Sequence, residues 1–198
     1  KHIHRLLVTS STYRQASRGD ASSVARDPDN RYLTRWVPRR LEAESVRDAL
    51  LTVSGELDPT LGGNPDVDES KSLRRGLYQL QKRHKPPAVQ LLFDGPTGAT
   101  ESCPRRTESE TPLSALFLLN NPFTLERAKA FAQRVRKNAG EDLQKQTVYA
   151  FRLALGRLPT AAEQKALTAY FAKVTEKDES LTELCHLLVM LNEFTTLE

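Results

Sequence analysis

Cysteine, histidine and aromatic residues are scarce in this chain, and each shortage excludes a class of protein. The 198 residues include 2 cysteines and 4 histidines, and aromatic residues make up 7%. Two cysteines cannot build a disulfide-dense scaffold or a four-cysteine zinc site. No HExxH pair is present, and His2 and His4 would lie about 200° apart on a helix. We therefore expect no metal site.

Long apolar runs and nucleotide-binding motifs are missing as well. No apolar stretch approaches the ~20 residues that cross a bilayer, so we expect no membrane span. The P-loop, dinucleotide-binding and nucleophile-elbow patterns (GxxxxGK[ST], GxGxxG, GxSxG) do not occur. The first residues, KHIHRLLVTSSTYR, lack the apolar core of a signal peptide, and we expect the chain to be a piece of a longer protein.

The charge of the chain is basic but evenly spread. Its net charge is +4 and its pI is about 9.1. Basic residues alternate with acidic ones, as in RRLEAESVRD and TLERAKAFAQRVRK. Such a pattern is typical of solvated helix faces with ion pairs, whereas a nucleic-acid site needs a continuous basic stripe. We expect no nucleic-acid partner.

The apolar residues recur at helical spacing along most of the chain. No stretch alternates with period two, and no repeat of fixed length is present. We predict one all-α domain over residues 1–198, an irregular multi-helix bundle with long connecting loops. Its expected sub-parts are the N-terminal helices of 1–57 and a bundle over 72–197, joined by a loop at 58–71.

Local signals predict where the elements lie. Helices are expected near 1–16 and 38–57, whereas the composition of residues 17–31 predicts a surface turn. AVQLLFD favours a helix over a buried extended run. Thr160 and Glu163 form a capping box. The expected buried stripes include Leu73, Leu77 and Leu80; Phe123, Ala128, Phe131, Ala132 and Val135; Leu167, Tyr170, Phe171 and Val174; and Leu181, Leu184, Leu187, Leu188, Leu191 and Phe194.

Seven phrases in order resemble a known family. They are HRLLVTSSTYRQ, RDPDNRYLTRWVPRRLEAESVRDALL, RRGLYQLQKR, FDGP, CPRRTESETPLSALFLLNNPF, FRLALGRLPTAAE and LLVMLNEF. Together, from His4 to Phe194, they resemble the C-terminal domain of unknown function of large planctomycete proteins that begin with a cytochrome c-like domain. Two features depart from that family. Only nine residues, Asn64–Ser72, stand where a longer insertion is usual, and Ser114 replaces a glutamine.

The resemblance implies a setting rather than an activity. It implies an extracytoplasmic (periplasmic or secreted) location and partners among other domains or subunits of the same haem-associated system. The chain has no CxxCH, so it cannot attach a c-type haem covalently. We therefore expect no cofactor in this chain and c-type haem only on a neighbouring domain.

The first candidate site lies on the predicted helix at 38–57. Arg40, Glu44, Arg47 and Asp48 follow at spacings of three or four, so they share one helix face, with Arg39 at its edge. These side chains could recognise an anionic group. Alternatively, they form an ion-pair network that fixes helix packing, which is the interpretation we favour.

The second candidate site lies in the loop before the helix that starts at Pro112. Asp94 suits a tight turn, and Arg105 and Arg106 precede the helix N-terminus, where anions bind favourably. An anionic ligand could sit here. Alternatively, the arginines pair with nearby carboxylates and anchor the loop, and we favour this second interpretation.

Three interpretations of Cys103 are open. Arg105 and Arg106 could stabilise a reactive thiolate. In an oxidising compartment Cys103 could form a disulfide with Cys185. The reading that we favour is a buried or free thiol without a chemical role.

Two function hypotheses follow. The first is an auxiliary, interaction or ligand-binding module of an extracytoplasmic, haem-associated multidomain protein. The alternative is a catalytic domain that acts on an anionic or saccharide substrate through a cleft lined by Arg, Asp and Glu. The sequence does not establish whether the chain is an enzyme.

Overall fold

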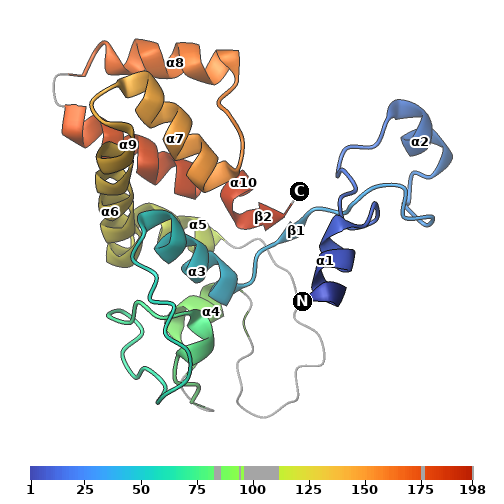
Figure 1. The fold of residues 1–198 in the computed structure, drawn as a ribbon, viewed down its shortest axis with the longest axis horizontal. Coiled ribbons are helices and arrows are strands. Elements are labelled where there is room, and N and C mark those ends of the chain that lie inside the picture. Colours follow the sequence, from blue (N-terminus) through green and yellow to red (C-terminus); the bar gives the residue numbers. More distant parts are fainter. Residues whose placement is uncertain (83–85, 94, 96–111, 175–176, 198) are drawn as a thin grey trace. The chain divides into compact units, whose positions relative to one another are not determined.

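The computed structural model describes residues 1–82, 86–93, 95, 112–174 and 177–197, and helices dominate these residues (Figure 1). This confirms the predicted helical fold class. The sheet structure of these described residues is one small sheet of two strands. The elements are α1 (His2–Thr9), α2 (Ala21–Arg26), β1 (Arg39–Arg40), α3 (Ala43–Ser54), the 3-10 turn η1 (Gly76–Tyr78), α4 (Ala88–Leu92), α5 (Pro112–Asn120), α6 (Pro122–Ala139), α7 (Leu143–Leu155), α8 (Ala161–Phe171), α9 (Lys177–Met190), α10 (Asn192–Thr195) and β2 (Thr196–Leu197).

The chain forms two compact units, one of residues 1–40 with Thr196 and Leu197, the other of residues 41–195. In the first unit β1 pairs with β2 in antiparallel register, Arg39 opposite Leu197. The sub-parts expected from the sequence, 1–57 and 72–197, stay a prediction.

Polar side chains organise the first unit. Asp27 is buried, and its carboxylate accepts hydrogen bonds from the backbone N–H groups of Arg31 and Tyr32. Asn30 is buried beside it and donates to the Arg35 carbonyl at 2.8 Å. No apolar residue of 1–40 is fully buried. This unit is therefore held by a hydrogen-bonded turn rather than by a hydrophobic core.

Three predictions for the first unit are wrong. The opening helix ends at Thr9 rather than near residue 16, and the expected surface turn at 17–31 contains α2. Arg39 and Arg40, expected to lie in the helix at 38–57, instead form β1, because they pair with the C-terminal strand β2. The reason for the second error is local capping. The Asp20 carboxylate accepts hydrogen bonds from the N–H groups of Ser22 and Ser23, which starts a short helix inside a polar stretch.

The core of the second unit surrounds α6, which packs against α3, α5, α7 and α9 (Figure 1). Every apolar side chain that was expected to line α6 from Ala128 to Val135 is buried, as predicted. The neighbouring helices contribute Val46, Leu50, Val53, Phe117, Leu118, Ala150, Phe151, Leu181, Leu184, Leu188 and Val189.

Local caps set the ends of these helices. Asn121 accepts from the Phe123 N–H at 2.9 Å, and Pro122 occupies the first turn of α6. The capping box of Thr160 and Glu163 starts α8, as predicted. Gly55 ends α3 with a φ of 80°, a conformation that glycine adopts without strain.

Three predictions about packing are wrong. Residues 73–80 form η1 and extended segments instead of a helix. Leu167 and Phe171 of α8 pack against the core as expected but are only partly buried, and Tyr170 is 37% exposed, because α8 lies at the surface of the second unit. Leu187 is 47% exposed, since the Leu184 and Leu188 face of α9 is the one turned toward the core. AVQLLFD does contain a helix, α4.

Candidate functional site

The polar face of α3 is anchored to the segment that follows it in sequence. Arg47 is only 2% exposed, and its guanidinium binds backbone carbonyls more closely than it approaches the Asp48 carboxylate, which lies 4.0 Å from Nη1. Nη1 donates to the Arg74 carbonyl at 2.7 Å, and Nη2 donates to the carbonyl of Ser72 and, at 3.5 Å, to that of Glu69. The side chain therefore fixes the backbone of residues 69–74 against α3.

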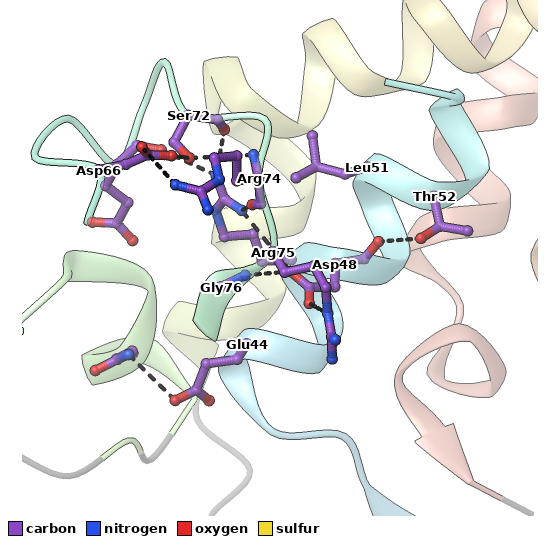
Figure 2. A network of polar contacts seen from close by, with 12 residues as sticks. Glu44, Asp48, Leu51, Thr52, Asp66, Ser72, Arg74, Arg75 and Gly76 are labelled. Carbon is purple, nitrogen blue, oxygen red and sulfur yellow. Dashed lines mark hydrogen bonds and ion pairs between the residues drawn. The ribbon is translucent and has the colours of Figure 1, made fainter. Parts of the chain in front are cut away.

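The neighbouring carboxylates on α3, those of Asp48 and Glu44, also anchor later parts of the chain to this helix, as Figure 2 shows. Asp48 accepts a hydrogen bond from the Gly76 N–H at 2.6 Å and pairs with Arg75 Nε at 3.5 Å. Glu44 accepts from Gln90 Nε2 at 3.3 Å, which links α3 to α4. Each of these residues contacts a different part of 69–90.

Arg74 holds the loop at 58–71 together (Figure 2). Its guanidinium donates to the carbonyls of Thr60, Gly62 and Asn64 and stacks 4.0 Å from the Tyr78 ring centroid. The same guanidinium also forms an ion pair with the Asp66 carboxylate, in which Nη1 and Oδ1 are 3.7 Å apart. The stretch has no helix or ladder of its own, as predicted, but side-chain bonds to its backbone give it a defined path.

This path encloses one side of a cavity in the second unit. The cavity has a volume of about 580 Å³, within the range of small-molecule sites in proteins. Its lining comes from α3, the 66–70 loop, residues 79–82 and 86–89 with Leu92, α5, and the N-terminus of α6. The lining residues are Arg47, Asp66, Val67, Asp68, Glu69, Ser70, Gln79, Leu80, Lys82, Pro86, Pro87, Ala88, Val89, Leu92, Phe117, Asn121 and Phe123.

The cavity has an apolar floor and a polar lip. Val89, Leu92 and Phe117 pack on the hydrophobic core and form the floor. Carboxylates gather at the lip, on the 66–70 loop. Glu69 joins the two sides, because its carboxylate accepts from the N–H groups of Ala88 at 2.9 Å and of Val89 at 3.2 Å.

The charged side chains around the cavity differ in burial and in pKa. Desolvation by burial lowers the pKa of Arg47, opposed by the nearby Asp48 carboxylate. The hydroxyl of Ser70 lowers the pKa of Asp68, so this exposed carboxylate is ionised at neutral pH. Phe123 lies between two guanidinium groups, 5.4 Å from Arg47 and 4.8 Å from Arg127. Among the charged residues of the lining, Asp68 and Lys82 are exposed, Asp66 and Glu69 are half-buried, and Arg47 is buried.

The candidates of the first site lie in different places. Arg39 and Arg40 form β1 in the first unit, whereas Glu44, Arg47 and Asp48 lie on α3 in the second. The three α3 side chains share a face, as their spacing indicated, and of these only Arg47 lines the cavity. The contacts of these three side chains indicate a role in packing.

The second candidate site lies outside the described residues. Asp94, Cys103, Arg105 and Arg106 all belong to it, so anchoring and anion binding both stay predictions. Cys185 is buried in α9, and burial raises the pKa of its thiol. The proposed disulfide also stays a prediction.

Most of the cavity lining was missed by sequence reasoning. The 66–70 loop had been treated as a connector, although its acidic residues were the available signal. Gln79 lies in the wall, but residues 73–80 had been assigned to a helix. Phe123 had been assigned to the core. Nothing in the spacing of these residues indicates that they meet.

The described residues contain neither a metal-binding cluster nor a membrane-spanning helix. No group of three or more His, Cys, Asp or Glu side chains is placed to hold a metal ion there. In the same part of the chain, no helix combines the length and apolar character needed to cross a membrane.

Of three comparisons with known proteins, one found a match. No curated protein and no solved structure matches the chain. A family model, described as PSD1, protein of unknown function (DUF1553), matches residues 1–171. This match covers most of the 198 residues. The chain therefore belongs to the PSD1 family of proteins of unknown function (DUF1553).

Proposed function

We propose that this chain is a non-catalytic, ligand-binding module, and that the cavity beside Arg47 is its binding site. The observation that carries the proposal is the cavity itself, about 580 Å³ with an apolar floor and a polar lip. A cavity of this size, with a few polar groups around an apolar surface, is typical of small-molecule sites.

The state of the carboxylates supports binding rather than catalysis. A general acid needs a raised pKa, whereas the pKa of Asp68 is lowered. Asp66 accepts a hydrogen bond from the Ser72 hydroxyl and pairs with Arg74, and Glu69 binds two backbone N–H groups of α4. These carboxylates hold structure and present oxygen atoms, and neither property requires chemistry on a ligand.

The setting of the module is a separate part of the proposal. We infer a haem-associated, extracytoplasmic multidomain protein of planctomycete type, in which this chain serves as an auxiliary module. Support comes from the resemblance of the seven sequence phrases. Haem staining and cell fractionation of the full-length protein test it. Absence of covalent haem or a cytoplasmic location would contradict the inferred setting without affecting the cavity.

A neutral probe tests the cavity. Tyrosol combines an aromatic ring with two hydroxyl groups, and we expect it to bind saturably and to shift the amide resonances of the lining residues in an NMR titration. Ala88→Trp should abolish these shifts, since Ala88 is exposed at the cavity wall and a large ring there fills it.

A matched variant on the same helix serves as the control. Leu91 is exposed on α4 and is not part of the lining, so Leu91→Trp should leave tyrosol binding unchanged. Both variants should give the helical circular dichroism of the wild type. Binding that survives in Ala88→Trp, or that is lost equally in both variants, would show that the cavity is not the site.

A further inference from the structure

The cavity lip presents acceptor atoms toward a ligand. Asp66, Asp68 and Glu69 lie within four residues of one another and all line the cavity. Ionised carboxylates accept hydrogen bonds but cannot donate them. A ligand group that binds these carboxylates directly must therefore be a hydrogen-bond donor.

The cations of the lining do not reverse this preference. Arg47 is enclosed, and both of its terminal nitrogens already donate to backbone carbonyls. Its Nε has no hydrogen-bond partner among the described residues, but that atom is buried as well. Lys82 is the remaining basic residue of the lining and is exposed. Two of the three carboxylates also pair with cations outside the lining, Asp66 with Arg74 at 3.7 Å and Asp68 with Lys71 at 3.6 Å. An ionised carboxylate has about four acceptor positions, so each can still accept a further hydrogen bond.

A buried amide in the wall points independently to a ligand. Gln79 lines the cavity and is 5% exposed. Its Nε2 is buried without a hydrogen-bond partner in the part of the chain that the structure describes. A buried donor without an acceptor is costly, so a ligand oxygen that reached it would bind favourably.

We propose that the ligand of this cavity is a small organic amine, with an ammonium group at the Asp66–Glu69 lip, an apolar body on the Phe117 floor and an oxygen acceptor near Gln79. This deepens the proposed ligand-binding function and rests on it. Ammonium is preferred to hydroxyl at the lip because charge-assisted hydrogen bonds to carboxylates are stronger than neutral ones.

Three isosteric probes separate the effect of charge from that of the apolar body. Tyramine, tyrosol and phloretate share a hydroxyphenyl ring and an ethylene linker and end in ammonium, hydroxyl and carboxylate. In NMR titrations at neutral pH and low salt, tyramine should bind about fivefold tighter than tyrosol, and phloretate weakest. The advantage of tyramine should shrink as salt is added, because salt screens exposed charges.

Asp68 and Asp142 form a matched pair of variants. Each carboxylate accepts from an N–H two residues later and lies near a lysine three residues later, Lys71 at 3.6 Å and Lys145 at 3.7 Å. Asp142 does not line the cavity. Asp68→Asn should lower the preference for tyramine over tyrosol, whereas Asp142→Asn should leave it unchanged. Asparagine retains the side-chain oxygen that holds both turns.

The outcomes separate this inference from the proposed function. Equal binding of tyramine and tyrosol, or tightest binding of phloretate, would overturn the amine and leave the cavity as a binding site. A preference for tyramine that is lost equally in both aspartate variants would also overturn it. If none of the three probes shifts the lining resonances, the proposed function fails together with the inference.

Discussion

Asp48 on α3 accepts a hydrogen bond from the backbone N–H of Gly76, 28 residues further along the chain, at 2.6 Å (Figure 2). The approach is close, because a Cβ atom added to Gly76 would lie 3.0 Å from the Cβ atom of Glu44. This contact, together with that of Arg47, places residues 69–76 beside α3 and so positions one wall of the cavity.

Replacing Asp48 by alanine should destabilise the protein. The Gly76 N–H would lose its acceptor, and an unsatisfied, partly buried donor costs about 1–3 kcal/mol of unfolding free energy. Asp48→Asn retains the acceptor and should cost less. Urea unfolding measures both variants, and equal losses would show that the charge of Asp48, rather than its bond to Gly76, is what matters.

Replacing Arg47 by methionine should lower the unfolding free energy by about 3 kcal/mol, because the carbonyls of Ser72 and Arg74 lose charged donors. Arg75 offers a control, since it is exposed and pairs with Asp48 at 3.5 Å. Arg75→Met should cost less than about 1 kcal/mol. A small effect of Arg47→Met in urea unfolding would contradict the structural role that we assign to this guanidinium.

Truncation of Leu188 tests the packing of α9. Leu188 is 1% exposed, and Leu188→Ala should cost about 2–5 kcal/mol through lost burial and the cavity left behind. Its neighbour Leu187 is 47% exposed, so Leu187→Ala should cost much less. Chemical denaturation of the two variants, side by side, measures the difference. A loss below about 0.5 kcal/mol for Leu188→Ala would mean that α9 is peripheral.

Arg157 joins α8 to α10 and makes part of the stability pH-dependent. Its guanidinium donates twice to Glu163, at 2.9 Å each, and to Glu193 at 2.6 and 2.8 Å. The hydrogen bonds from Arg157 are the main cause that lowers the pKa of Glu163 from 4.5 to about 2. Because the folded-state pKa is the lower one, this stabilisation is present above pH 4.5 and is lost as the pH falls toward about 2.

Glu163→Gln should therefore destabilise the protein at neutral pH, and its difference from the wild type should shrink as the solution is acidified through that range. Thermal unfolding at a series of pH values measures the trend. Glu141, an exposed glutamate, provides Glu141→Gln as a control that should show no such dependence. A Glu163→Gln difference that stays constant with pH would contradict the assignment.

The segment at 73–80 shows how a helical pattern can fail. Leu73, Leu77 and Leu80 recur at helical spacing, yet Leu77 is 72% exposed and the segment forms only η1. Its backbone groups are bound by distant side chains, among them Arg47 and Asp48. The spacing of apolar residues reflects only contacts between residues three or four positions apart. These long-range hydrogen bonds therefore could not be predicted from it.

By itself the sequence determined the helical class, the α6 stripe and the cap of α8, because each depends on residues within about four positions of one another. It also indicated the shared face of Glu44, Arg47 and Asp48. Only the tertiary structure decided what that face contacts and that a cavity lies beside it. The cavity joins residues from Arg47 to Phe123. Chain segments so far apart in sequence meet only through the packing of α3, α4, α5 and α6.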